Sequence, residues 1–389
     1  YVFSLLKYEI YSSLNKNMDL SISIGHLNRS YGWEFIGQVE RLVRTDLTER
    51  CFLTFAEGLA FGYGGAPFGP AGTGKTETVK EMGHSLGKAV IVFNCEEAND
   101  LENIGRLLTG VMGAGVWGCF DEFNRISFDA LSSISQIIIG IQNIIKVNKT
   151  DDTLIKSELN GKPIVVSKLS ALFITLNPAS EEYTGRSKLP DNFKSMFRSF
   201  ALIKPDLYSI LKISLSCAGF KIEFSEFAAK LLINIFSESQ ITLTNEITYD
   251  WGLRSLKSII RLSSCLKQEN NSKEELGDIG IIKKAVDITV ISRLLPEDKI
   301  EFEKIFNRFL KSSYSFEKNK NIESQNEDQD VLLGKCFEEA GMIKNADQII
   351  FLKQILSLID QTTGLAILGE SGSGKTSLLL LLKEFYKLK

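Results

Sequence analysis

A short glycine-rich segment of this sequence has the residue types that bind a polyphosphate. In "GPAGTGKT", Gly69, Gly74, Lys75 and Thr76 fit the pattern G-x-x-x-x-G-K-[ST]. The glycines let backbone N–H groups curl around phosphates at the N-terminus of a helix, where unpaired donors and the helix dipole favour anions. The lysine then reaches the β- and γ-phosphates, and the threonine hydroxyl is a ligand for Mg²⁺. The segment predicts a nucleotide site, and a chance glycine turn is the alternative.

An acidic pair follows an apolar run further along the sequence. The run "VWGCFDEF" ends in Asp121 and Glu122. An acid at a strand tip beside a phosphate loop can hold Mg²⁺ through water, and an adjacent glutamate can polarise the attacking water. In isolation, two exposed acids at a strand end would be the simpler interpretation. The phosphate loop ahead of them favours the catalytic one.

Three further polar residues are candidates for the same chemistry. Asn177 ends "LFITLNP", where a side chain at a third strand tip would orient the attacking water, although an Asn before Pro178 is equally typical of a turn. Arg198 and Arg254 lie in stretches with helical patterns after the predicted sheet. An arginine can stabilise charge on a transferring phosphoryl group, in cis or from a neighbouring module. The pattern alone does not distinguish these two arginines from solvated surface residues.

A second glycine-rich segment, "GESGSGKT", repeats the consensus near the end of the sequence with Gly369, Gly374, Lys375 and Thr376. The apolar residues ahead of it predict a strand. An acidic strand to complete this second site would lie beyond Lys389. The sequence therefore predicts nucleotide binding there and makes no prediction of hydrolysis.

The elements that must position these residues alternate between strands and helices. The segments between the apolar runs have helical patterns, which favours a parallel α/β sheet. From about residue 204 onward, apolar residues recur at helical spacing, so a helical subdomain is expected behind the sheet. The predicted strands are 88–95, 115–123 and 171–178; the other predictions are a helix at 50–61, a Gly/Pro loop directly after it, and a helix in "SLLKYEIYSSL" near the start.

The bulk composition excludes several classes of protein. Hydrophobic residues make up 44% and charged residues 24%, an ordinary globular balance, and a net charge of −3 gives no basic field for nucleic acid or an anionic membrane. Six separated cysteines and two histidines argue against a disulfide framework or a zinc site and predict reduced core thiols. No apolar run is long enough to span a membrane, and no signal pattern opens the sequence. A soluble intracellular protein, cut from a longer chain, is the expectation. The polar stretch 311–330 predicts a solvated loop.

Six motifs occur in a fixed order and spacing: "GGAPFGPAGTGKTETVK", "VIVFNC", "GVWGCFDEFNRI", "LFITLNP", "KLPDNFKSMFRSFALIKPD" and "YDWGLRSLKS". Together they resemble the first AAA+ module of a dynein heavy chain. The motifs "CFDEFNR" and "YDWGLR" are far more specific than either phosphate loop. "FEEAG" followed by the second loop resembles the start of the second module, and residues 1–33 resemble the end of the linker. "FEEAG" and the pair Gly219 and Phe220 indicate the cytoplasmic type, and within it the intraflagellar-transport branch.

The resemblance implies an α/β fold of the P-loop NTPase AAA+ type, with helices flanking a parallel sheet and an α-helical lid. The expected domains are the end of the linker (1–33), the large α/β subdomain with the hydrolytic ATP site (34–203), the small helical subdomain (204–290), a connector with the polar loop (291–345) and the start of a second AAA+ module (346–389).

The resemblance also implies roles for the candidate residues. Glu122 corresponds to the catalytic base, Asn177 to the first sensor and Arg254 to the second sensor. Asn94 corresponds to the residue that restrains the catalytic glutamate, and Arg198 to an arginine finger that acts in trans. The expected nucleotide contacts are Gly69, Pro70, Ala71, Gly72, Thr73, Gly74, Lys75, Thr76, Glu77, Asn94 and Asp121 in the first site and Gly369, Ser371, Gly372, Gly374, Lys375 and Thr376 in the second; the expected Mg²⁺ ligands are Thr76 and Asp121.

Two departures from the family pattern affect these expectations. The segment "RTDLTERC", from Arg44 to Cys51, lacks a proline in the loop expected to approach adenine. Glu370 replaces the commoner proline of the second loop and adds a negative charge beside an anion site. Weaker nucleotide binding at the second loop is the consequence we expect.

The implied function is that of an ATP-hydrolysing module of a microtubule motor, with ATP and Mg²⁺ as cofactors and linker movement as its output. The expected partners are neighbouring AAA+ modules of the same chain and, through regions outside this sequence, intermediate and light chains and microtubules, with no nucleic acid or membrane. The expected location is the cytoplasm, the microtubule cytoskeleton and the cilium. Two alternatives stay open: another tandem AAA+ remodelling ATPase, and a nucleotide-binding scaffold without turnover.

Overall fold

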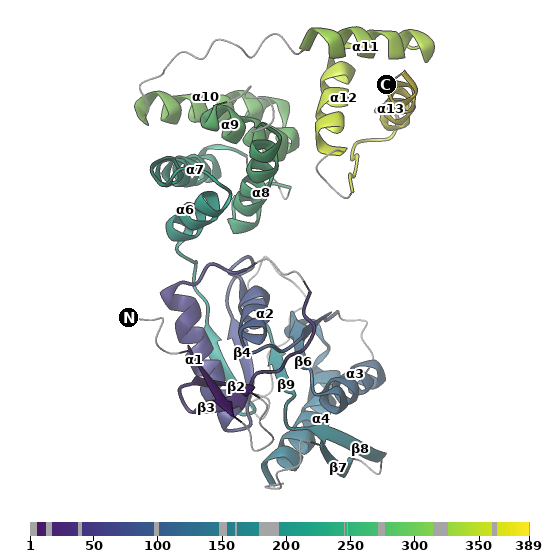
Figure 1. Cartoon of the computed structure of the whole chain (residues 1–389). Coiled ribbons are helices and arrows are strands. Elements are labelled where there is room, and N and C mark those ends of the chain that lie inside the picture. The colour runs from purple at the N-terminus through teal and green to yellow at the C-terminus, as the bar shows by residue number, and fades with distance from the viewer. Residues whose placement is uncertain are drawn as a thin grey trace. The chain divides into compact units, whose positions relative to one another are not determined.

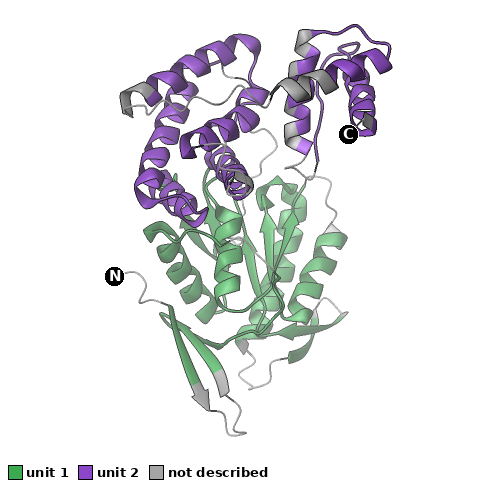
Figure 2. Cartoon of the chain, turned by 45° about the horizontal axis from the view of Figure 1, so that its top comes forward, with its two compact units in different colours: residues 1–206 green, residues 207–389 purple. Residues whose placement is uncertain are grey.

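A computed structural model of the chain describes residues 6–12, 18–37, 41–96, 101–147, 154–159, 162–178, 194–244, 246, 248–270, 277–313, 326–359 and 364–388. The chain forms two compact units, residues 1–206 and 207–389, which Figure 2 shows in different colours. Each unit has hydrophobic cores of its own.

The first unit is built on a five-stranded parallel sheet (Figure 1), which confirms the predicted fold class. Because all strands run in the same direction, their carboxyl ends meet at one edge of the sheet, where loops can build a site. The order across the sheet is β10 (Phe197–Ala201), β4 (Gly64–Phe68), β9 (Ala171–Ile174), β6 (Trp117–Asp121) and β5 (Val90–Asn94).

Helices cover both faces of this sheet, because successive side chains of a strand point to opposite faces. Trp117 and Phe173 pack into one core, and Phe120 and Ile174 pack into the other. The result is a three-layer arrangement with a sheet buried on both sides. The first core contains α1 (Asp46–Ala60) and α2 (Lys75–Ser85), and the second contains α3 (Leu101–Ala114) and α4 (Phe128–Val147).

Two strands of this sheet are absent from the sequence-based prediction. The glycine-rich β4 is predicted as a loop, but a side chain at Gly64 or Gly65 would collide with the rings of Phe197 or Phe173 at about 2.5 Å. Glycine in a strand commonly marks such a close approach. The helix predicted around Arg198 is also wrong, because this segment pairs with β4 as the edge strand β10.

The N-terminal residues form a three-stranded antiparallel sheet rather than the predicted helix. It consists of β1 (Leu6–Ser12), β2 (Met18–Ile24) and β3 (Leu27–Ser30), and residues 4, 5, 13 and 14 of the predicted helix lie outside the described residues. A short apolar run fits a helix and a strand equally well, and pairing with β2 decides in favour of the strand. Ile22, Ile24 and Leu27 join the core around α1 and α2.

A β-hairpin, β7 (Leu154–Leu159) and β8 (Lys162–Ser167), follows α4 and packs on the α3 and α4 side through Ile164 and Val166. Within the described part of the chain, α4 is the one helix long and apolar enough to cross a membrane. Ile134 and Ile141 of α4 are nevertheless fully buried against the sheet. The apolar composition of α4 therefore reflects its place in the core.

The second unit is helical, as predicted. One core joins α6 (Leu207–Cys217), α7 (Ile222–Thr242), α8 (Leu253–Asn270), α9 (Asp278–Thr289) and α10 (Pro296–Ser313). Another core joins α11 (Asn326–Glu339), α12 (Ala346–Ile359) and α13 (Lys375–Leu388). Most of the predicted polar loop, 314–325, lies outside the described residues.

Two smaller predictions have mixed outcomes. The strand predicted ahead of the second phosphate loop is wrong, because residues 364–370 have no strand partner within the described chain. The six cysteines are thiols rather than disulfides, and the prediction of core thiols is right for four of them and wrong for Cys217 and Cys265, which are exposed.

Candidate functional site

The first phosphate loop connects β4 to α2. Gly72 and Gly74 have φ values of 75° and 82°, a region that side chains other than glycine rarely adopt, and Gly74 is the N-cap of α2. The ammonium of Lys75 is buried and donates hydrogen bonds to the carbonyl oxygens of Gly69 at 2.8 Å and Pro70 at 2.7 Å. The loop thus brings a cation and a helix N-terminus together, which is the arrangement that binds phosphate.

Thr76, in the first turn of α2, lies against the acidic pair at the end of β6. Its hydroxyl donates to Asp121 Oδ1 at 2.7 Å. Mg²⁺ prefers oxygen ligands and usually takes one or two from protein, with phosphate oxygens and water completing its shell. Among the residues that the structure describes, no group of three His, Cys, Asp or Glu side chains forms a metal cage. The hydroxyl and carboxylate fit Mg²⁺ bound together with a nucleotide.

Glu122 follows Asp121 in a left-handed backbone conformation, with φ 52° and ψ 42°. Its carboxylate accepts a hydrogen bond from Asn177 Nδ2 at 2.9 Å through Oε1, and its Oε2 lies 2.5 Å from Arg125 Nε. The structure therefore brings the predicted base and the predicted sensor into direct contact, although they are far apart in the sequence.

Asn177 contacts two residues of the site, one through its backbone and one through its side chain. Its backbone oxygen accepts a hydrogen bond from Asn124 Nδ2 at 2.8 Å, and its amide reaches Glu122. The Oδ1 atoms of Asn124 and Asn177 are both buried and accept no hydrogen bond from described groups. Because buried acceptors normally find a donor, this corner of the site is suited to hold water or a ligand donor.

Three residues of this site escaped the sequence analysis: Asn124, Arg125 and Thr175. The hydroxyl of Thr175 donates to Asp121 Oδ1 at 2.5 Å and accepts from the backbone N–H of Glu122 at 2.9 Å. A signal for Thr175 existed in the two-residue period of strands. Because Phe173 faces the core that contains α2, Thr175, two positions later, lies on the same face of the sheet as α2.

Other candidate residues are placed at the margin of the site or away from it. Asn94 ends β5 in register with Asp121 and is exposed, and Glu77 lies on the exposed face of α2 with Lys80 at 2.8 Å. Arg198 pairs with Gly65 near the amino end of β4, whereas the phosphate loop follows the carboxyl end of β4. Arg198 is therefore not positioned to reach the phosphate loop of its own module.

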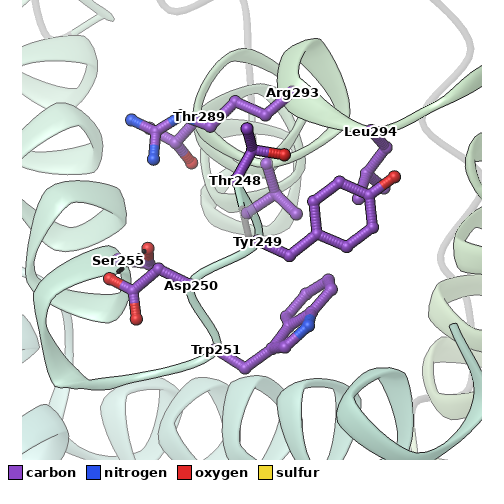
Figure 3. Close-up of a pocket in the computed structure, with 9 residues that line it drawn as sticks. Thr248, Tyr249, Asp250, Trp251, Ser255, Thr289, Arg293 and Leu294 are labelled. Atoms are coloured by element: carbon purple, nitrogen blue, oxygen red, sulfur yellow. Dashed lines mark hydrogen bonds between the residues drawn. The ribbon is translucent and has the colours of Figure 1, made fainter. Parts of the chain in front are cut away.

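Arg254 belongs to the second unit, where it is exposed in the first turn of α8. The turn ahead of it is fixed by Asp250, which accepts hydrogen bonds from Gly252 N at 2.9 Å and Ser255 Oγ at 3.1 Å. Figure 3 shows the small cavity beside this turn, of about 20 Å³, enough for one water molecule. Its lining residues are Thr248, Tyr249, Asp250, Trp251, Ser255, Thr289, Val290, Arg293 and Leu294.

The second phosphate loop has the same local geometry as the first. Lys375 Nζ donates to the carbonyl oxygens of Gly369 at 2.8 Å and Glu370 at 2.5 Å, and Gly372 and Gly374 both have a φ of 83°. In the described chain, no carboxylate partner accepts a hydrogen bond from Thr376, in contrast to Thr76 with Asp121. The second loop therefore has the binding geometry without the acidic pair. Ser371 is exposed in this loop.

Comparison with known proteins gives consistent matches. The family model for the hydrolytic ATP binding site of the dynein motor region matches residues 31–376. Cytoplasmic dynein 2 heavy chain 1 of Chlamydomonas reinhardtii is 37% identical over 373 residues, covering 95% of this chain and 8% of the relative. The human protein of that name is 37% identical over 356 residues, covering 91% and 8%. The cytoplasmic dynein heavy chain of Caenorhabditis elegans is 37% identical over 356 residues, covering 89% and 8%.

These matches decide between two of the families considered from sequence. They cover nearly the whole chain, and they name dyneins rather than another tandem AAA+ ATPase. The names of these relatives agree with the predicted cytoplasmic type. The chain spans 8% of the length of these relatives. The chain belongs to the dynein heavy-chain family and contains the region described in that family as the hydrolytic ATP-binding site.

Proposed function

We propose that this chain binds and hydrolyses ATP at the first phosphate loop, as the catalytic module of a dynein-type microtubule motor. One observation carries the proposal. Thr76, Asp121, Glu122 and Asn177 form a connected set of hydrogen bonds at the carboxyl edge of the sheet, directly beside the loop of Lys75. A scaffold that only binds nucleotide has no need to position a glutamate against a sensor amide.

The residues divide the chemistry between them. The loop and Lys75 bind the β- and γ-phosphates, and Thr76 with Asp121 would hold Mg²⁺, which supplies charge neutralisation at those phosphates when bound. Glu122 orients the attacking water and accepts its proton, and Asn177 keeps the Glu122 carboxylate in place. Arg125 pairs with the other oxygen of Glu122, and opening of this ion pair would free that oxygen for the attacking water.

Residues outside this cluster have proposed roles that depend on neighbouring modules. Arg254 acts as the second sensor, and Asn94 restrains Glu122 until the site is assembled. Arg198 acts in trans on the site of an adjacent AAA+ module, which its distance along β4 from its own phosphate loop supports. A finger for the first site would come from the next module.

Contacts of the N-terminal segment support a coupling of the site to the linker. The Tyr8 hydroxyl of β1 donates to the carbonyl oxygen of Ser85, in the last turn of α2, at 3.0 Å. The backbone N–H of Gly32, after β3, donates to the carbonyl oxygen of Leu86, directly after α2, at 2.9 Å. Since α2 begins at the phosphate loop, a shift of this helix on hydrolysis would be transmitted to these strands, which we propose form the end of the linker.

The wider setting of this activity is proposed from the relatives. The longer protein would bind microtubules and intermediate and light chains through other regions, in the cytoplasm and, for a dynein 2 heavy chain, in the cilium. The net charge of −3 supports a set of partners without nucleic acid or membrane lipid.

The Glu122→Gln variant tests the proposal. An amide cannot accept the proton, so we expect the variant in the complete heavy chain to bind ATP and turn it over at least about 100-fold more slowly. Rapid-quench measurement of ATP and ADP on the protein would show trapped ATP. Glu102→Gln, at an exposed carboxylate of α3 that pairs with Arg106, is the matched control. Turnover of the Glu122 variant at the wild-type rate would eliminate Glu122 as the base.

A further inference from the structure

Thr175 makes hydrogen bonds with four consecutive residues that include both acids of the site. Its backbone N–H donates to the Phe120 oxygen at 2.9 Å, and its backbone oxygen accepts from Phe123 N at 3.0 Å. Its hydroxyl donates to Asp121 Oδ1 at 2.5 Å and accepts from Glu122 N at 2.9 Å. Thr175, the residue directly after β9, thus holds the end of β6 both through its backbone and through its side chain.

The Thr175 hydroxyl is buried, and its donor and its acceptor each have a specific partner. Thr175 is 0% exposed, so no water can replace its hydroxyl without opening the core. Its single proton goes to Asp121, which leaves the oxygen lone pairs for the N–H of Glu122. One hydroxyl therefore sets the side-chain direction of one acid and the backbone direction of the next.

The backbone of Glu122 needs this support. A non-glycine residue in the left-handed region is disfavoured because its Cβ crowds the following carbonyl oxygen. The hydrogen bond from the N–H of Glu122 to the Thr175 hydroxyl oxygen fixes the peptide plane from which this turned conformation starts, where the chain leaves β6. This backbone turn then directs the Glu122 carboxylate to Asn177.

The same hydroxyl acts on the proposed Mg²⁺ ligands. Asp121 Oδ1 accepts from both Thr76 and Thr175, so the carboxylate is oriented from the α2 side and from the β9 side. Groups that orient a metal-ligating carboxylate commonly change metal affinity or activity about 10–100-fold when removed.

We propose that Thr175 is a positioning residue that couples the two acids, fixing Asp121 for Mg²⁺ and Glu122 for water through one hydroxyl. The inference rests on the proposed ATPase function and deepens it. This positioning role is distinct from a packing role. Packing would depend on the methyl group of Thr175, whereas positioning depends on its hydroxyl.

A pair of substitutions separates these roles. Thr175→Val keeps the shape and removes the hydroxyl, whereas Thr175→Ser keeps the hydroxyl and removes the methyl group. Both would be made in the complete heavy chain, with Thr54→Val as the matched control, because among the described residues the Thr54 hydroxyl bonds only to Arg50 O in α1. The measurements are steady-state ATP turnover as a function of Mg²⁺ concentration, and binding of a fluorescent ATP analogue with Mg²⁺ and with EDTA.

We expect Thr175→Val to lower turnover and to raise the Mg²⁺ concentration for half-maximal turnover, each by about tenfold or more. Its affinity for the analogue in EDTA should stay within about twofold of wild type, because the phosphate loop itself is untouched. Thr175→Ser should stay within about threefold of wild type in every measurement. If the valine variant does not fold, Thr175→Ala compared with Thr175→Ser gives the same contrast.

Three outcomes would overturn the inference. They are a wild-type Mg²⁺ requirement and turnover in the valine variant, an equal defect in the serine variant, and a parallel loss of affinity in EDTA. The test is also distinguishable from that of the proposed function. If the wild-type chain did not turn over ATP, the ATPase proposal would fail, whereas the Mg²⁺ dependence of analogue binding would still test Thr175.

Discussion

The carboxylate of Glu122 is held at both oxygens, by a neutral amide and by a cation. Asn177 orients it through a hydrogen bond, whereas Arg125 pairs with it at 2.5 Å. While Arg125 holds one oxygen of Glu122, that oxygen is less available to an attacking water, because the ion pair must open first. The ion pair is partly exposed, with 47% of the Arg125 side chain accessible, so water weakens it.

Replacement of Arg125 by Met should therefore release Glu122 and raise basal ATP turnover. An exposed pair is worth about 0–1 kcal/mol, which corresponds to at most about a fivefold increase. The measurement is steady-state turnover of the complete heavy chain without microtubules. Arg106→Met is the control, since Arg106 forms a comparable exposed pair with Glu102 on α3 at 2.6 Å. A loss of turnover similar to that of Glu122→Gln would instead assign Arg125 a supporting role in the reaction.

The residues of the site differ in how visible they are in the sequence. Lys75, Asp121 and Glu122 were predictable because their chemistry is local: a loop pattern, and acids directly after an apolar run. Thr175 and Arg125 were not, because a threonine in a strand and an arginine after a turn are common. Only the pairing of β6 with β9 brings the Thr175 hydroxyl to the acids.

Among the secondary-structure elements, tertiary packing overrode local preference at β4 and β10. Gly64 and Gly65 predict a loop by propensity, but in the sheet they admit the rings of Phe197 and Phe173. The edge strand β10 exists because β4 offers it a partner. Strands 88–95, 115–123 and 171–178 were predictable because each is a short continuous apolar run in the sequence, a pattern that does not depend on a specific neighbour.

Helix α9, which packs with α10, contains Asp287, an acid whose charge opposes folding. Burial raises the pKa of Asp287 from 3.8 to about 6, against the opposing effect of Lys283 and with a further rise from Glu303 of α10. Between about pH 4 and pH 6 the folded state binds more protons than the unfolded state, so stability falls as pH rises through this window and stays low above it.

Asp287→Asn should remove this penalty, since the amide has no charge to desolvate. We expect the free energy of unfolding to rise by about 1–3 kcal/mol at pH 7 and to change little at pH 4. Urea denaturation of the complete chain at both pH values, followed by hydrogen exchange of the α9 and α10 amides, measures the difference. Glu301→Gln, on the exposed side of α10, should have little effect at either pH. A gain that does not depend on pH would assign the effect to packing rather than to charge.

For the molecule as a whole, the two phosphate loops have similar geometry and different surroundings. Lys75 and Lys375 make equivalent hydrogen bonds within their loops, and paired glycines in both have positive φ values. Only the first loop has an acidic pair and a sensor amide beside it within the described chain. Each of the two compact units, residues 1–206 and 207–389, carries one of the loops.

Lys75→Ala and Lys375→Ala should therefore have unequal effects in the complete heavy chain. Without the Lys75 ammonium, no side-chain cation in the first loop neutralises the negative charge that develops on the phosphates beside Glu122. We therefore expect turnover to fall by about 100-fold or more. Lys375→Ala should weaken nucleotide binding at the second loop and lower turnover by less than about threefold, since the proposed base Glu122 and its sensor Asn177 belong to the first loop. Lys387→Ala, an exposed lysine paired with Glu384 on α13, is the control for the second unit. Equal losses from the two loop lysines would mean that the second site is required for turnover, and that hydrolysis belongs to a cycle shared by both modules.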